Sequence, residues 1–347
     1  MTSASPSLLM RADASREIGS GHIMRCLALA KAWQSGGGTV CCTMAESIPA
    51  LENRLTREGI VLKQIDAEAG TTADLEMTVA EARLAKAARL VVDGYRFGPD
   101  YLRQLRAAGI PVLFLDDDGR FEFYTADVVL NQNISANADM YLNRESFTQL
   151  LLGSQFALLR PEFLAESRTR EHPEGASKVL VTMGGSDPNN VTRKVLLALS
   201  RTRTDLETTI VLGSGYSQAS ELRSLVKQLS LNICVEQNPE DMAPLMRWAD
   251  VAISGAGGTC WELGYSGLPS IVIALSRDQQ GIARGLAENG IAVSLGWHAN
   301  LSEERIGEAL SSLLVDREGR REMSERGREL VDGQGAARVV RFLKNSL

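Results

Sequence analysis

Residues 11–26 read RADASREIGSGHIMRC, and this stretch decides the fold. An apolar run over 8–10 precedes it, and an amphipathic run over 23–33 follows it. Strand, glycine turn and helix in this order are typical of a parallel α/β sheet. The pattern places His22, one of only three histidines, at a helix N-terminus. Backbone N–H groups point outward there and favour anions.

The composition bounds the class of protein. The chain has 347 residues, of which 44% are hydrophobic, and this is enough for two domains. Its net charge of −6 and the lack of a basic block argue against a nucleic-acid partner. No apolar run approaches the ~20 residues that span a membrane. The first residues lack the basic and apolar regions of a signal peptide, so we expect a cytoplasmic protein.

Neither cysteines nor acidic clusters predict a metal site. The five cysteines are odd in number and show no CxxC or zinc spacing, which favours free thiols. Asp116-Asp117-Asp118-Gly119 is better interpreted as a strand end that turns through Asp and Gly than as a metal cluster. We therefore expect no metal and no cofactor.

Strand-like and helix-like runs alternate through the chain, which indicates doubly wound parallel sheets. The polar stretch 168–175 interrupts this alternation and is interpreted as a linker. We expect a Rossmann-like domain over 1–167 and a second over 177–347, with a cleft between them at the carboxyl ends of the strands. The expected strands are 8–11, 39–44, 61–65, 90–93, 112–116, 128–131, 179–183, 209–212, 233–236, 251–254, 270–274 and 291–294.

The first glycine turn, Gly19-Ser20-Gly21, matches no complete phosphate-binding motif. Met24 stands where G-x-G-x-x-G requires its third glycine, and no P-loop lysine follows. A histidine in the first helical turn feels the positive end of the helix dipole, which disfavours its protonated form. Because a general base must be neutral, His22 is the candidate base. The alternative is a helix cap or a packed ring.

Two further glycine turns follow strands of the second half. In the first, Gly185 and Ser186 can hold an oxyanion, and Asp187 and Asn190 either join them or only cap the next helix. In the second, Gly257 and Gly258 let a diphosphate approach the backbone, and a helix starts near Thr259. Glu262 lies one turn further on and suits a ribose diol; the alternative is a solvent-exposed helix residue.

Two polar residues of the first half lie just past strand ends. Asp13 is expected either to orient His22 or to bind a sugar hydroxyl. Tyr95 is expected to reach a phosphate.

Together these motifs resemble the PseG family, the UDP-2,4-diacetamido-2,4,6-trideoxy-β-L-altropyranose hydrolases of pseudaminic acid biosynthesis. The resemblance continues through 116–117, Asn131, 157–163, 183–187 and 259–262, and it covers nearly the whole chain. Related spore-coat polysaccharide proteins share the pattern. The family commonly carries Asp-His-Tyr where this chain has Asp93-Gly94-Tyr95, which alters the wall of the cleft.

The resemblance implies a MurG-like GT-B fold, in which two Rossmann-like domains face one another across a cleft. It implies that His22 activates water and that UDP lies on the C-terminal domain. It also implies that no metal is needed. The substrate-binding candidates are Asp13, Gly21, Tyr95, Arg160, Gly185, Ser186, Asp187, Asn190, Gly257, Gly258, Thr259 and Glu262.

The expected reaction is hydrolysis of a UDP-linked diacetamido-trideoxy sugar to free sugar and UDP. UDP is a good leaving group, so no second carboxylic acid is required. One alternative is a GT-B glycosyltransferase, in which an acceptor hydroxyl replaces water. Another is a sugar-nucleotide-binding protein without turnover. Met24 disfavours a nicotinamide oxidoreductase.

Overall fold

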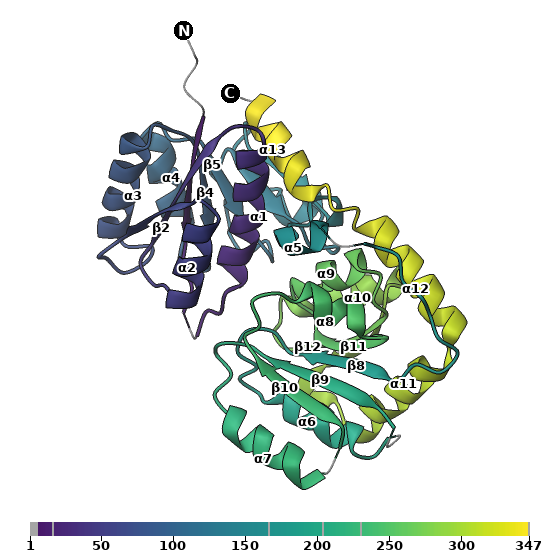
Figure 1. The fold of residues 1–347 in the computed structure, drawn as a ribbon. Helices are drawn as coiled ribbons and strands as arrows, with labels where there is room; N and C mark the ends of the chain where they lie inside the picture. Colours follow the sequence, from purple (N-terminus) through teal and green to yellow (C-terminus); the bar gives the residue numbers. More distant parts are fainter. Residues whose placement is uncertain (1–5, 16, 166, 203–204, 230, 346–347) are drawn as a thin grey trace. The chain divides into compact units, whose positions relative to one another are not determined.

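The computed structural model describes residues 6–15, 17–165, 167–202, 205–229 and 231–345, which fold as two units. Unit 1 comprises Met1–Pro161 and Gly333–Leu347, and unit 2 comprises Glu162–Asp332. Each unit is built on one parallel sheet with helices packed on it (Figure 1).

The sheet of unit 1 has the strand order β3-β2-β1-β4-β5-β6-β7. The order reverses between β1 and β4, and in such sheets ligands bind beside the reversal, at the carboxyl ends of the strands. Ala12 pairs with Asp93 at this point, so the segments that follow both strands leave the sheet side by side. The strands are β1 (Ser7–Ala12), β2 (Thr39–Met44), β3 (Val61–Gln64), β4 (Ala87–Asp93), β5 (Val112–Leu115), β6 (Val128–Asn131) and β7 (Gln149–Leu152).

Helix α1 (Gly21–Ser35) follows β1 directly, as residues 11–26 predict. Gly19 supplies the turn with a φ of +79°, which side chains rarely tolerate. Apolar residues recur every three or four positions on the buried face of α1, and this spacing fixes the helix against the sheet. The other helical elements of unit 1 are α2 (Pro49–Arg57), α3 (Thr72–Leu84), α4 (Pro99–Ala107), η1 (Ala138–Tyr141), η2 (Ser154–Phe156) and α13 (Gly335–Asn345).

The C-terminal helix corrects the expected domain division. Figure 1 shows α13 beside α1, and Val339 and Leu343 belong to the same apolar cluster as the buried face of α1. Lys344 Nζ also donates to the Gly36 carbonyl at 2.8 Å. Helix α13 therefore packs on unit 1, whereas the sequence pattern assigned it to the second domain. The amphipathic pattern of a helix predicts that one face packs on a hydrophobic core, but it does not predict which of the two cores that is.

Unit 2 has the strand order β10-β9-β8-β11-β12-β13, with the reversal between β8 and β11. The glycine turns after these two strands are therefore neighbours. Its strands are β8 (Lys178–Thr182), β9 (Glu207–Leu212), β10 (Ile233–Gln237), β11 (Val251–Gly255), β12 (Ser270–Ala274) and β13 (Ala292–Trp297). Its helices are α6 (Val191–Leu199), α7 (Ala219–Leu229), α8 (Ala243–Trp248), α9 (Thr259–Tyr265), α10 (Gln279–Glu288), η3 (His298–Asn300), α11 (Glu303–Val315) and α12 (Arg317–Leu330), and the short α5 (Pro161–Leu164) joins the units.

Candidate functional site

His22 lies in the first turn of α1 and contacts the carboxyl end of β4. Its Nδ1 is 2.6 Å from Oδ1 of Asp93, the last residue of that strand. An ionised carboxylate only accepts hydrogen bonds, so we assign the ring hydrogen to Nδ1. Nε2 is then left with a lone pair. A histidine held in this tautomer by a buried carboxylate can take a proton from a bound molecule.

Arg25, one helical turn beyond His22, holds the same carboxylate from its other side. Its Nε is 2.6 Å from Asp93 Oδ2, and its Nη1 is 2.7 Å from Asp117 Oδ1. Burial alone would raise the pKa of Asp93, but the charge of Arg25 and the hydrogen bonds from Arg25 and His22 outweigh burial and hold that pKa well below its ordinary value. Asp93 is therefore the permanent anion behind His22.

Asp13 does not orient His22, contrary to one of the two expected roles. Its Oδ1 accepts from Arg11 Nη1 at 2.7 Å and from the backbone N–H of Ala45 at 2.7 Å. Arg11 is fully buried and also donates to both carboxylate oxygens of Asp74, at 2.8 and 3.1 Å. These contacts tie the end of β1 to the loop after β2 and to α3.

Sequence reasoning missed Asp93 and Arg25 as partners of His22, and Asp117 as the second carboxylate bound to Arg25. The available signal was the position of Asp93 at the end of an expected strand. Which strand lies beside β1 depends on the crossover of the chain, and no local pattern gives it. Tyr95 follows the end of β4, and its ring stands edge-on to the His22 ring, with centroids 5.1 Å apart. Its contact with a phosphate stays a prediction.

The remaining candidates of unit 1 are Gly21 and Arg160. Gly21 is the first residue of α1, and an added Cβ would meet no atom within 4 Å, so the space beside His22 is open at this point. Arg160 is partly buried and directly precedes α5.

The turn after β8 packs closely against neighbouring segments of unit 2. A Cβ on Gly213 would lie 2.2 Å from the Gly185 carbonyl oxygen, so the loops after β8 and β9 touch backbone to backbone. The Asp187 carboxylate accepts from the backbone N–H groups of Val191 and Thr192, both at 2.8 Å. It thus caps α6, which is the second of the two roles left open for it.

Asn190 and Ser186 complete this turn. Asn190 has a φ of +51°, and its side chain contacts Tyr216 Oη at 2.6 Å and the Gln218 amide. This side chain does not cap α6. Ser186 is partly exposed, which leaves its hydroxyl accessible to a ligand.

The turn after β11 is more open. A Cβ on Gly258 would meet nothing within 4 Å, and one on Gly257 would meet only the Gln279 amide, at 3.4 Å. Helix α9 begins at Thr259, as expected. Glu262 is only 7% exposed, so its interpretation as a solvent-exposed helix residue is wrong.

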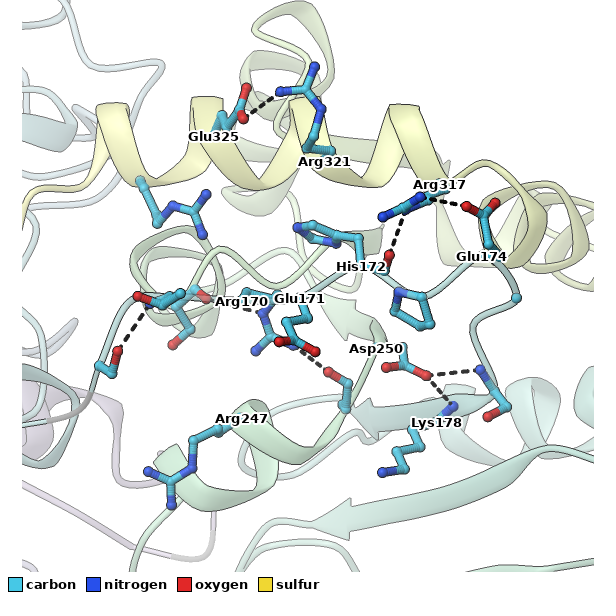
Figure 2. A pocket seen from close by; sticks show the side chains of 18 of the residues that line it. Arg170, Glu171, His172, Glu174, Lys178, Arg247, Asp250, Arg317, Arg321 and Glu325 are labelled. Carbon is cyan, nitrogen blue, oxygen red and sulfur yellow. Dashed lines mark hydrogen bonds and ion pairs between the residues drawn. The ribbon is translucent and has the colours of Figure 1, made fainter.

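A cavity of about 1500 Å³ lies in unit 2 at the amino-terminal end of the strands, where β8 begins (Figure 2). Arg170 donates to backbone carbonyls at the ends of α8 and α9, including that of Met246 at 2.5 Å. Arg317 pairs with Glu174. These contacts bind the stretch 168–175 to unit 2, so it is not a free linker. Helix carboxyl ends and carboxylates thus neutralise these cations, and the cavity is not our candidate site.

His172 borders the same cavity. Its Nε2 is buried and has no hydrogen-bond partner among the described residues. Burial, and then the charges of Arg170, Arg320, Arg328 and Arg317, lower the pKa of His172 to about 4.

The acidic run after β5 has its own partners. Asp116 accepts from the hydroxyls of Tyr124 at 3.0 Å and Tyr141 at 2.8 Å. Within the described ranges, no group of three or more His, Cys, Asp or Glu side chains is arranged to hold a metal ion. No helix in the described part of the chain is long and apolar enough to cross a membrane.

Comparison with known proteins assigns most of unit 2 to a family model. Residues 179–336 match the glycosyltransferase family 28 C-terminal domain. Three curated relatives match the chain over longer stretches. The chain is 26% identical to an uncharacterized protein of Methanocaldococcus jannaschii over 75% of this chain and 54% of that protein, so it spans about half the length of this relative.

The other two relatives have descriptive names. The chain is 28% identical to the spore coat polysaccharide biosynthesis protein SpsG of Bacillus subtilis, over 67% of this chain and 69% of SpsG. It is 26% identical to the UDP-2,4-diacetamido-2,4,6-trideoxy-beta-L-altropyranose hydrolase of Campylobacter jejuni, over 82% of this chain and 98% of the hydrolase.

Solved structures share the fold over nearly the whole chain. MurG of Acinetobacter baumannii is 20% identical and has a TM-score of 0.66, covering 98% of this chain and 99% of its own. Spinosyn rhamnosyltransferase SpnG, complexed with thymidine diphosphate, is 18% identical and has a TM-score of 0.68, covering 98% of this chain and 100% of its own. The chain therefore has the GT-B fold of glycosyltransferases such as MurG and SpnG, with a family 28 C-terminal domain matched over residues 179–336.

Proposed function

We propose that the chain hydrolyses a UDP-linked 2,4-diacetamido-trideoxy sugar to free sugar and UDP, in nonulosonate biosynthesis of the pseudaminic acid type. The observation that carries this proposal is the His22–Asp93 pair, with 2.6 Å between Nδ1 and Oδ1, at the strand-order reversal of unit 1. The similarity to a hydrolase of such a sugar, over 98% of its length, supports the choice of substrate.

In the proposed reaction Nε2 of His22 takes a proton from water as the water oxygen bonds to the anomeric carbon. The bond from that carbon to the diphosphate oxygen breaks, and UDP leaves with the electron pair. Attack comes from the face opposite UDP, so the anomeric configuration inverts. Asp93 remains ionised and stabilises the imidazolium that forms.

We assign the nucleotide to unit 2. The open backbone at Gly257 and Gly258 suits a diphosphate, since phosphate oxygens can approach N–H groups that no side chain covers. The partly exposed Ser186 hydroxyl is a further donor, and Glu262 suits the ribose hydroxyls. Asp187 has a capping role in this assignment.

The second candidate function is glycosyl transfer from the same donor. The family 28 match and the likeness to SpnG favour it. His22 would then take the proton from an acceptor hydroxyl, and the rest of the chemistry would be unchanged.

One experiment separates the candidates. The protein is incubated with a panel of UDP-amino sugars in ¹⁸O-water without any acceptor, and products are followed by NMR and mass spectrometry. Hydrolysis predicts UDP release with ¹⁸O on the free sugar, and His22→Asn should lower kcat by ~10²–10⁴-fold. UDP release only when an acceptor is added would support transfer instead. Tight binding of a UDP-sugar with no product under either condition would indicate a sugar-nucleotide-binding protein without turnover.

A further inference from the structure

An arginine that the sequence motifs do not single out lies near His22. Arg120 follows the turn after β5, and its guanidinium carbon is 4.9 Å from the centroid of the Tyr95 ring. Its Nη2 lies 3.4 Å from the Gly94 carbonyl oxygen. Since Tyr95 in turn stands edge-on to His22, one aromatic ring separates Arg120 from the candidate base.

The position of Arg120 is set by several groups rather than one. Phe121 offers a second ring, 5.1 Å from the guanidinium carbon. Gly94 has a φ of +147°, and a Cβ there would lie 3.0 Å from the Phe97 ring, so this backbone turn requires glycine. The turn directs the Gly94 carbonyl to Arg120 and the Tyr95 ring to His22. Stacking and this carbonyl contact limit the freedom of an otherwise exposed side chain.

The charge of Arg120 is not neutralised by a carboxylate. The carboxylates of Asp93 and Asp117 are bound to Arg25, and that of Asp116 accepts from tyrosine hydroxyls. In the described part of the chain, no ion pair joins Arg120 to an acidic side chain. Arg25, the other cation beside His22, has two carboxylates. Arg120 therefore carries a positive charge that, among the described residues, no ion pair neutralises, and it can attract an anion.

We propose that Arg120 is a substrate-binding residue that donates to an anionic oxygen of the substrate's diphosphate. The inference rests on the proposed function, since the diphosphate is the anionic part of a UDP-sugar. A guanidinium presents paired N–H donors that match two phosphate oxygens, and it stays charged at every relevant pH.

The test measures binding of UDP and of uridine to the full chain by calorimetry. Wild type is compared with Arg120→Ala, Arg120→Lys and a control, Arg103→Ala, which removes an exposed arginine of α4 in the same unit. We expect Arg120→Ala to weaken UDP binding about tenfold or more and to leave uridine binding unchanged. Arg120→Lys should lie between, because a lysine keeps the charge but not the paired donors. Arg103→Ala should bind like wild type.

Failure of this inference differs from failure of the proposed function. If wild type binds UDP and Arg120→Ala binds it equally well at an unchanged melting temperature, Arg120 has only a packing role. Equal losses for UDP and uridine would also overturn the phosphate contact. If wild type does not bind UDP at all, the proposed function fails, and this inference fails with it.

Discussion

Nδ1 of His22 lies 2.6 Å from Oδ1 of Asp93, although the two residues are 71 positions apart in the chain. The contact exists because β1 and β4 are neighbours in the sheet, so α1 starts beside the end of β4. It converts a histidine that sequence alone places at a helix end into a base with a fixed tautomer. Arg25 keeps the carboxylate ionised, so Asp93 remains a hydrogen-bond acceptor for the His22 ring.

Asp93→Asn should therefore separate catalysis from binding. An amide has no negative charge to stabilise the imidazolium, and it can rotate its NH₂ group toward Nδ1, which favours the wrong tautomer. We expect kcat to fall ~10²–10⁴-fold with UDP affinity nearly unchanged. Steady-state kinetics and UDP titration measure the two effects. The matched control is Asp100→Asn, an exposed aspartate of α4 in the same unit. Full activity of Asp93→Asn would contradict the role of the pair.

Gly94→Ala should destabilise unit 1. The φ of +147° is unfavourable for alanine, and the new Cβ would press on the Phe97 ring at 3.0 Å. We expect a loss of about 1–3 kcal/mol in the free energy of unfolding, measured by urea denaturation. Gly175→Ala is the control, because a Cβ there meets no atom within 4 Å and its φ lies outside the strained range. Equal stabilities of the two variants would show that the turn at Gly94 accepts a side chain.

The sequence predicts those features of the fold that neighbouring residues determine. Glycine turns after buried strands mark the carboxyl ends of both sheets, and His22 and Thr259 lie at the helix starts expected for them. The sequence did not predict strand β7, because β7 is a four-residue edge strand with no α-helix between it and β6. The alternation of strands and helices stops there. The contact of Asp93 with His22 and the packing of α13 on unit 1 were not predicted either, because the partners come from distant segments of the chain. Strand order and helix packing have no local signal in the sequence.

Leu343→Ala tests the return of α13 to unit 1. Leu343 is 1% exposed in the cluster that includes the buried face of α1. Removing its side chain leaves a cavity in that cluster, and we expect a loss of about 2–5 kcal/mol. Hydrogen exchange should show faster opening of α1 and β1, with the amides of β8 and β11 in unit 2 unaffected. Faster exchange confined to unit 2 would contradict this assignment of α13.

His172→Gln should flatten the loss of stability in acid. The pKa of His172 is about 4 in the folded chain against an ordinary value of 6.5. Between these pH values the unfolded chain binds a proton that the folded chain does not, so the free energy of unfolding falls as the pH drops from 6.5 toward 4. The ring is partly exposed, and solvent screens the nearby arginines, so we expect His172 to account for about 1 kcal/mol of the loss in the free energy of unfolding.

Urea denaturation at a series of pH values measures this contribution of His172. Wild type and variant should differ by the same amount at pH 8 and pH 9, where the ring is neutral in both states, and the variant should lose less stability by pH 4.5. Parallel curves for the two proteins down to pH 4.5 would show that His172 is protonated in the folded chain as readily as in the unfolded one.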